Sequence, residues 1–292
     1  MPRPSTSRHR VVATALVAAL GLAGLETSAA LAAPVTPTPT EAARAAGVTL
    51  GNAYLGWRQA STARVPARPR LASTDAARRA FVPSGVLGID VSSHQGRVDW
   101  AAHAAAGKRF AYVKATEGTR YRNPYFSSQY SGAYNVGMIR GAYHFASPAR
   151  SSGRAQARFF VRNGGGWSPD RRTLPGVLDI EYNPYGAATC YGRTRKQLVA
   201  WIQSFLTEYK RLTSRHAVIY TTTDWWTRCT GNTTRFSRTN PLWAARYGST
   251  TPGRLPGSWR WATFWQYTST PLDQNRFSST YRRLVVLATK SR

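Results

Sequence analysis

From residue 86 onward, short strand-like runs alternate with stretches of helical periodicity, and this alternation limits the folds open to the chain. Strands that alternate with helices build parallel α/β architectures. The last three strand-like runs have fewer helical residues between them. We therefore predict an α/β fold, a single irregular TIM-like (β/α) barrel over 86–292, with helices short or missing on its C-terminal strands. The predicted strands are 88–92, 110–114, 138–145, 177–181, 217–221, 242–247 and 261–267, and the predicted helices are 98–106, 124–136, 154–162 and 194–212.

The strand-like run 177–182 carries two acids in a chain that has only twelve. Successive side chains of a strand point to opposite faces, so Asp179 and Glu181 share one face and the apolar residues next to them share the other. Two neighbouring carboxylates repel each other, which raises one pKa and keeps that group protonated while the other stays charged. Cleavage of a glycosidic bond needs such a proton donor and such a carboxylate. Taken alone, the run is equally well explained by ion pairs with arginines at a solvated strand end.

Two further acids are predicted to lie near the same place. In a (β/α) barrel the reacting groups lie at the C-terminal ends of the strands. Asp90 comes near the end of the first predicted strand, and Asp273 follows the last one. Three separate parts of the chain therefore bring acids to one rim of the barrel, which favours a catalytic role over surface ion pairs.

The N-terminus predicts secretion. Three arginines in the first ten residues precede an uncharged apolar run at 11–25, and Ala30-Leu-Ala32 offers a small-x-small cleavage site. We expect residues 1–32 to be a signal peptide, cleaved after Ala32, and the protein to be secreted and extracellular. No later run approaches the length of a membrane span. The only two cysteines, Cys190 and Cys229, are then expected to form a disulfide in an oxidising compartment.

Residues 33–85 precede the predicted barrel. They begin with a Pro/Thr-rich linker at 33–40 and continue as an Ala/Arg-rich stretch with little apolar periodicity. We interpret them as a flexible lead or pro-segment with at most a short helix, and no function follows from them.

The chain is strongly basic, with a formal net charge of +28 at pH 7. Five of its 40 basic residues are lysines, which leaves 35 arginines. Such a surface favours polyanions such as nucleic acid, an anionic membrane or an acidic cell-wall polymer. A codon-usage bias towards Arg and Ala would produce the same composition without any function.

Seven short motifs occur in order between residues 86 and 287, roughly two-thirds of the chain. They are Gly88–Gly96 followed by Trp100, Tyr112–Thr119, Gly141–Phe145, Leu178–Glu181, Leu242–Ala244, Trp265–Tyr267 and Leu272–Asn275. A lone Asp-x-Glu is a weak signal, but the ordered series is specific. It resembles the glycoside hydrolase family 25 lysozymes, the Chalaropsis-type N-acetylmuramidases. The resemblance does not extend to residues 33–85.

The resemblance implies a secreted bacterial peptidoglycan hydrolase that cleaves the β-1,4 bond between N-acetylmuramic acid and N-acetylglucosamine with retention. It places the general acid/base on Glu181, its partner on Asp179, and further catalytic acids on Asp90 and Asp273. Whether a protein carboxylate or the substrate's own acetamido group attacks the sugar stays open. The expected partners are bacterial peptidoglycan and anionic wall polymers, with no nucleic acid and no membrane, and we expect a monomer.

Aromatic side chains at or near the predicted strand ends are candidates for stacking on sugar rings, although core packing explains any single one equally well. The candidate substrate-binding residues are Tyr143, Tyr182, Tyr220, Trp243, Tyr247, Gln266 and Tyr267. The five histidines lack close ligand spacing and neither cysteine is near one, so we predict no metal and no cofactor. We expect Lys114 and Glu117 to form a structural ion pair, and Trp225 and Trp226 to pack in the core.

Two other functions fit part of the sequence. A secreted binding protein could hold wall polymer or nucleic acid on its basic surface, in a salt-dependent way, without cutting it. The acids argue against it, because carboxylates in a binding cleft weaken the capture of a polyanion. A chitinase-like hydrolase on the same barrel would carry a longer acidic series on one strand, whereas this chain has only Asp179 and Glu181 there.

Overall fold

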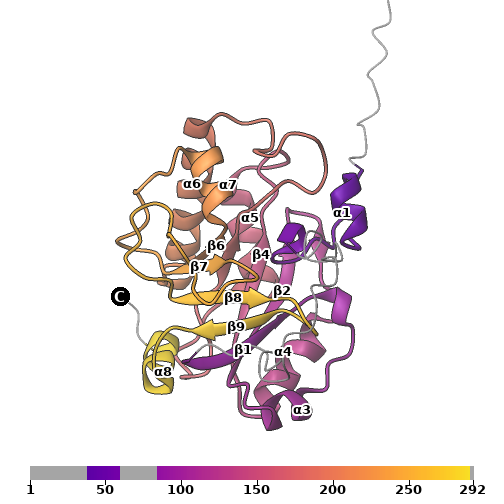
Figure 1. Ribbon diagram of the computed structural model, residues 1–292, viewed down its shortest axis with the longest axis vertical. Helices are drawn as coiled ribbons and strands as arrows, with labels where there is room; N and C mark the ends of the chain where they lie inside the picture. The colour runs from indigo at the N-terminus through magenta and orange to yellow at the C-terminus, as the bar shows by residue number, and fades with distance from the viewer. Residues whose placement is uncertain (1–37, 60–83, 290–292) are drawn as a thin grey trace, which may run out of the picture. The chain divides into compact units, whose positions relative to one another are not determined.

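Eight strands close into a barrel in the computed structural model, which describes residues 38–59 and 84–289 (Figure 1). The hydrogen-bonded order is β1-β9-β8-β7-β6-β5-β4-β2, and the pairing of β1 with β2 closes the ring. A ninth strand, β3, forms an antiparallel pair with β2. The strands are β1 (Val86–Val91), β2 (Phe110–Glu117), β3 (Tyr121–Arg122), β4 (Ile139–Phe145), β5 (Val177–Asp179), β6 (Val218–Thr221), β7 (Leu242–Ala245), β8 (Phe264–Thr268) and β9 (Gln274–Phe277).

The barrel is TIM-like but irregular, as predicted, and the irregularity is β9. This strand runs antiparallel to both β1 and β8, while the other neighbours in the ring are parallel. The strand prediction missed β9 because its four residues are mostly polar and show no apolar alternation. Since β9 is antiparallel, its first residue, Gln274, pairs with Ile89 near the end of β1. The start of β9 therefore lies at the barrel end where the parallel strands finish.

Helices cover the first half of the barrel more fully than the second. The connections from β7 to β8 and from β8 to β9, all of whose residues are described, contain no helix. This confirms the predicted loss of helices on the C-terminal strands. The sequence prediction missed α7 and α8. The helices are α1 (Glu41–Ala45), α3 (Trp100–Ala105), α4 (Phe126–Asn135), α5 (Gly153–Phe160), α6 (Arg195–Thr213), α7 (Thr223–Thr230) and α8 (Tyr281–Thr289), with a 3-10 turn at Ser93–Gln95 and a π turn at Val161–Gly165.

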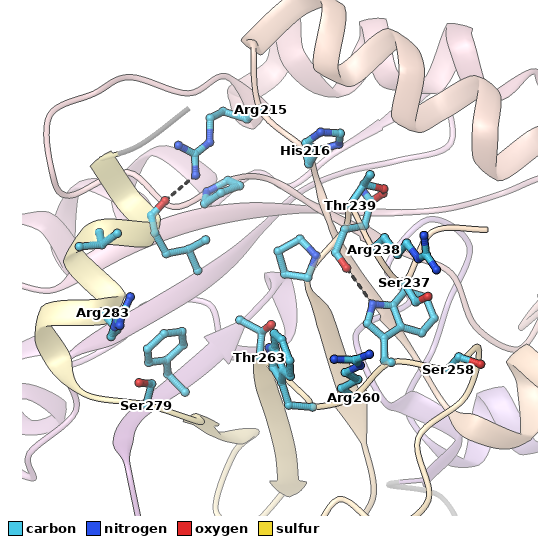
Figure 2. Close-up of a pocket in the computed structure, with 18 of the residues that line it drawn as sticks. Arg215, His216, Ser237, Arg238, Thr239, Ser258, Arg260, Thr263, Ser279 and Arg283 are labelled. Carbon is cyan, nitrogen blue, oxygen red and sulfur yellow. Dashed lines mark hydrogen bonds between the residues drawn. The ribbon is translucent and has the colours of Figure 1, made fainter. Parts of the chain in front are cut away.

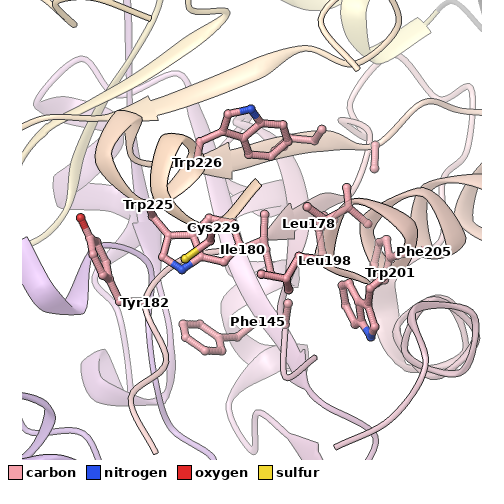
Figure 3. Close-up of a cluster of buried hydrophobic side chains, with 14 of the residues drawn as sticks. Phe145, Leu178, Ile180, Tyr182, Leu198, Trp201, Phe205, Trp225, Trp226 and Cys229 are labelled. Atoms are coloured by element: carbon pink, nitrogen blue, oxygen red, sulfur yellow. The ribbon is translucent and has the colours of Figure 1, made fainter. Parts of the chain in front are cut away.

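Strand β5 separates two clusters of buried side chains. Val177 belongs to the cluster inside the barrel. Leu178, Ile180 and Tyr182 belong to the cluster between the barrel wall and the helices, where α6 and α7 also contribute (Figure 3). This alternation puts Asp179 and Glu181 on the inner face, as predicted for a strand. Trp225 and Trp226 of α7 are fully buried in the outer cluster, so the prediction that they pack in the core is confirmed.

Residues 38–59, hereafter the N-terminal segment, pack against the barrel. Its short helix α1 begins with a Thr40 cap, and the Thr40 N–H donates to the carbonyl oxygen of Pro184 over 2.8 Å. Ala43, Val48 and Trp57 are buried in the outer cluster. The sequence predicted a flexible lead with at most one short helix, and for this part the flexibility is wrong. Its contacts are with residues distant in sequence, which local periodicity does not report.

The predicted disulfide between Cys190 and Cys229 is present. It joins the loop that precedes α6 to helix α7. The predicted signal peptide, 1–32, lies outside the described residues. Among the helices that the structure describes, none has the length and apolarity needed to cross a membrane.

Candidate active site

The four acids predicted from the sequence lie at one end of the barrel. Asp179 is the last residue of β5 and Glu181 follows it by two positions, while Asp90 is the penultimate residue of β1. Asp273 directly precedes the antiparallel β9, and its carbonyl oxygen accepts from the Asp90 backbone N–H over 3.3 Å. All four side chains are at most 5% exposed. The strand ends therefore bring together the acids that the sequence places in three separate regions.

Two amide side chains hold Asp90. Its Oδ2 accepts from Gln266 Nε2 over 2.9 Å and from Asn275 Nδ2 over 2.6 Å. Asn275 is itself oriented by the indole N–H of Trp243, which donates to its Oδ1 over 3.0 Å. Burial raises the pKa of Asp90 to about 7, although both hydrogen bonds act to lower it. Asp90 is therefore poised to change its charge near neutral pH.

Two tyrosines extend this network to Asp273. The hydroxyls of Tyr220 and Tyr247 donate to Gln266 Oε1 over 2.5 Å and 2.8 Å. The Tyr247 hydroxyl also lies 3.3 Å from Asp273 Oδ1. Burial raises the pKa of Asp273 well above its usual range, and the charge of Asp90 raises it further. Three predicted substrate-binding residues thus hold the acids in place in this structure.

Glu181 and Asp179 are the least solvated acids of the site. Glu181 Oε1 accepts from the backbone N–H of Gly56 over 2.7 Å, and burial raises the pKa of Glu181 to about 8. Neither carboxylate oxygen of Asp179 has a hydrogen-bond partner among the described residues. Burial raises the pKa of Asp179 well above its usual range, and the charge of Glu181 raises it further. A protonated Glu181 at neutral pH can act as a proton donor.

An ion pair lies beside the acids. Lys114 is fully buried on the inner face of β2, and its Nζ lies 2.6 Å from Glu117 Oε2, which confirms the predicted pair. The Tyr185 hydroxyl donates to the other Glu117 oxygen. Burial lowers the pKa of Lys114, and the charge of Glu117 opposes this shift. The described His, Cys, Asp and Glu side chains include no group that could hold a metal ion.

The remaining predicted substrate-binding residues lie in different environments. Tyr143 and Trp243 are fully buried in the cluster inside the barrel. Tyr182 is 9% exposed, and its hydroxyl donates to Asp224 Oδ2 over 2.8 Å. Tyr267 contacts Trp265, its neighbour two positions earlier on β8, so it lies on the opposite face of the strand from Gln266. Neither Tyr182, which belongs to the outer cluster, nor Tyr267 therefore shares the inner face of the barrel with the acids.

A pocket of about 660 Å³ adjoins the network of the acids through Tyr247, whose hydroxyl lies 3.3 Å from Asp273 Oδ1. Tyr182, Tyr247, Asp224 and Arg246 contribute to its wall, and so does Gln59 of the N-terminal segment. A cleft of this size is typical of small-molecule sites.

Two residues of the site, Asn275 and Gly56, were not predicted from the sequence to be site residues. Asn275 stands in the last of the seven motifs, so the motif was a signal for it, although its bond to Asp90 was not expected. Gly56 lies in a stretch without periodicity or motif, and no sequence signal marks it. Its position depends on the folding of residues 38–59 onto a distant part of the chain.

Comparisons with known proteins agree on one family. A family model described as "Glycosyl hydrolases family 25" matches residues 89–275, so the N-terminal segment precedes the match. Lysozyme M1 of Streptomyces globisporus is 51% identical over 213 residues, which are 70% of this chain and 72% of that protein. The N,O-diacetylmuramidase of Chalaropsis sp is 47% identical over 184 residues, 62% of this chain and 87% of that protein. The crystal structure of the bacterial lysozyme from Streptomyces coelicolor matches with a TM-score of 0.69 and 49% identity, and covers 72% of this chain and 99% of that one.

Proposed function

This chain belongs to the glycosyl hydrolases family 25 and is a muramidase, and on that premise we propose that Glu181 is the general acid and base with which it cleaves peptidoglycan. The bond is the β-1,4 linkage between N-acetylmuramic acid and N-acetylglucosamine, broken with retention. The observation that carries the proposal is the position of Glu181 at the end of β5, buried among three other acids, with its pKa raised to about 8. The raised pKa favours the protonated form of Glu181 at neutral pH, as a general acid requires.

In the first half-reaction, Glu181 gives its proton to the glycosidic oxygen as the bond from this oxygen to the anomeric carbon breaks, and the attacking group, either the substrate's 2-acetamido oxygen or Asp179, bonds to that carbon. The group left behind is then a carboxylate, which takes a proton from the water that completes hydrolysis. Asp90, whose charge acts on Glu181, sets the electrostatic environment for both steps. One residue serves as acid and then as base, so its loss removes both half-reactions.

Asp179 is the proposed partner of Glu181 at the sugar. Both of its oxygens lack a hydrogen-bond partner among the described residues, so they are available to accept from a substrate N–H. This supports a role in orienting the 2-acetamido group, and in its ionised form Asp179 would also balance the charge that develops there; attack by Asp179 itself on the sugar is the alternative. Tyr182 and Tyr247 line the adjoining pocket and are the proposed stacking surfaces.

A basic pocket supports the proposal that anionic wall polymers are partners of this enzyme. The pocket, drawn in Figure 2, measures about 1190 Å³. It includes Pro175 and Pro241, which precede β5 and β7, so it lies at the end of the barrel opposite to the acids. No acid is among its lining residues, and Trp261 at its edge is 67% exposed. The arginines that line it are Arg215, Arg238, Arg260 and Arg283. Because such polymers lie outside the cell, the proposal includes that the enzyme is secreted and acts there as a monomer.

The test is the Glu181→Gln variant, assayed for clearing of bacterial walls and for cleavage of a soluble peptidoglycan fragment. Losing a general acid typically costs about 10²- to 10⁴-fold in rate. Wall binding should persist, because the amide has nearly the shape of the acid. Glu208→Gln is the matched control, since Glu208 pairs with Arg158 of α5 and Arg211 of α6 and is not one of the four acids of the site. Near-normal clearing by a folded Glu181→Gln protein would refute the assignment.

A further inference from the structure

The N-terminal segment lies directly on the proposed catalytic carboxyl group. The Gly56 N–H donates to Glu181 Oε1 over 2.7 Å. Gly56 has φ +75°, and a Cβ at this position would overlap the Tyr247 hydroxyl oxygen. It would also lie 2.7 Å from Gln266 Oε1 and 3.0 Å from the Tyr220 hydroxyl oxygen. Only glycine therefore lets the backbone approach the polar network of the site this closely.

Apolar side chains on both sides of Gly56 hold it there. Leu55 is fully buried in the cluster inside the barrel, which also contains Tyr220. Trp57 is fully buried in the outer cluster, and its indole N–H donates to the carbonyl oxygen of Tyr182 over 3.3 Å. Removing two side chains of this size from water favours the docked segment.

Polar contacts hold the stretch before Leu55. Lys114 Nζ donates to the carbonyl oxygen of Gly51 over 3.2 Å and also to that of Ala53. The Gly51 N–H donates to the Tyr185 hydroxyl over 3.0 Å. The buried ion pair beside the acids therefore binds the backbone of the segment as well. The segment contacts the site along several residues and not at a single point.

A sugar and the docked segment exclude each other. A general acid must come within about 2.6–3.2 Å of the oxygen that it protonates. Glu181 is 0% exposed in this structure, and Gly56 occupies the approach to its carboxyl group. The pocket that stays open has Gln59 in its wall, so the segment also narrows the adjoining cleft. Substrate can reach Glu181 only after the segment has left.

We propose that the N-terminal segment is an intramolecular inhibitor, and that the chain with the segment docked is an inactive precursor of the muramidase. The proposed inhibition rests on the proposed function, because the reaction that is inhibited is the one proposed above. The docking of the segment does not depend on that function. While segment and barrel belong to one chain, the effective concentration of the segment is on the order of millimolar. Cutting the chain between the segment and β1 converts it into a peptide that can dissociate, and so activates the enzyme.

The test substitutes Gly56→Ala in the full chain. The added Cβ overlaps the site network and strains a left-handed backbone, so the undocked population rises. If the segment is docked in about 99% of molecules, kcat/KM for a soluble four-sugar peptidoglycan fragment rises on the order of tenfold or more. Gly47→Ala is the matched control, because Gly47 has φ +78° but its added Cβ would meet only a His94 ring carbon at 3.9 Å. We expect its kcat/KM to stay near that of the wild type.

A second variant and a second readout separate this inference from the proposed reaction. Leu55→Asp places a charge inside the barrel and should undock the segment without changing Gly56. Hydrogen exchange over residues 38–59 reports undocking, and calorimetry in the Glu181→Gln background reports binding of the same fragment. Suppose that Gly56→Ala and Leu55→Asp bind the fragment more tightly than the wild type does, but do not cleave it when Glu181 is intact. That outcome would refute the muramidase reaction and support inhibition by the docked segment. Equal kcat/KM and equal binding in wild type and undocked variants would overturn the inhibitor proposal.

Discussion

Asp179 and Glu181 show how two residues of one strand acquire different environments. Their side chains share the inner face of β5, and both are fully buried. A backbone N–H donates to Glu181, whereas the oxygens of Asp179 have no hydrogen-bond partner among the described residues. Burying a carboxylate without a partner lowers stability. Functional sites often carry such a cost, because the partner they are built for is the substrate.

Asp179→Asn should change how stability depends on pH. The pKa of Asp179 is raised in the folded state, so the folded chain holds a proton that the unfolded chain releases. The free energy of unfolding of the wild type therefore falls as the pH rises from about 4 through the folded pKa, by about 1.4 kcal/mol for each unit of raised pKa. The asparagine variant lacks this loss, so its stability relative to the wild type should grow between pH 4 and pH 8.

Urea unfolding at several pH values measures this difference. Asp99→Asn is the matched control, because Asp99 is an exposed N-cap of α3 that asparagine replaces well. A relative stability of Asp179→Asn that stays constant from pH 4 to pH 8 would show that the pKa of Asp179 is not raised.

At the level of elements, the disulfide joins a loop to a helix, and neither of them is part of the barrel sheet. Cys190 lies in the loop after β5, and Cys229 lies in α7, next to two buried tryptophans. The sequence separation of 39 residues includes the whole of α6 and β6. The loop after β5 also carries Tyr185, which contacts the N-terminal segment through Gly51. The bond therefore restrains a loop at the edge of the candidate active site.

Replacing both cysteines by serine should lower the stability of the fold. For a closed loop of this length the chain-entropy model gives about 4 kcal/mol, and measured values are often smaller. Guanidinium unfolding of the double variant against the wild type gives the loss. The intact wild type should have a mass two hydrogens below that of the dithiol. An unchanged unfolding midpoint would mean that packing of α7 already holds this region.

At the level of the whole molecule, charge is distributed unevenly. Residues 86–292 carry 25 arginines, five lysines and nine acids, a net charge of +21. Four of the nine acids lie together at one end of the barrel, and the arginine-lined pocket lies at the other. The enzyme therefore presents a basic surface to its surroundings while its cleft is less positive. Bacterial walls display carboxylates and often phosphates, which such a surface attracts.

Lysis of whole walls should weaken steeply as salt rises, while cleavage of a soluble fragment changes little. Attraction between exposed charges is screened over about 10 Å at 0.1 M salt. Both rates are measured on one preparation, so any docked N-terminal segment affects them equally. Arg238→Gln with Arg260→Gln removes two exposed charges of the basic pocket and should flatten the salt dependence of wall binding alone. If the rates of wall lysis and of fragment cleavage were equally sensitive to salt, the arginines would reflect compositional bias and not attraction to the wall.

Much of the fold and of the acid site was predictable, because it depends on local patterns. Short, largely apolar runs located the parallel strands, and the period of two put Asp179 and Glu181 on one face. The ordered motifs also located Asp90 and Asp273. The polar β9 carries no such pattern, and nothing local showed that Trp243 would lie inside the barrel, bonded to Asn275. The sequence likewise predicted that Lys114 pairs with Glu117, but not that it binds the backbone of the N-terminal segment.

The sequence by itself determined the family, the barrel, the acids at the strand ends and the pairing of the two cysteines. Each of these follows from residue type and spacing along the chain. Only the tertiary structure decided which groups hold those acids and that Gly56 lies on Glu181. The physical reason is that the docking of residues 38–59 depends on backbone hydrogen bonds and on burial against residues far away in sequence. Such contacts leave no periodic signal in the segment, since a carbonyl oxygen or an N–H group is the same in every residue that has one.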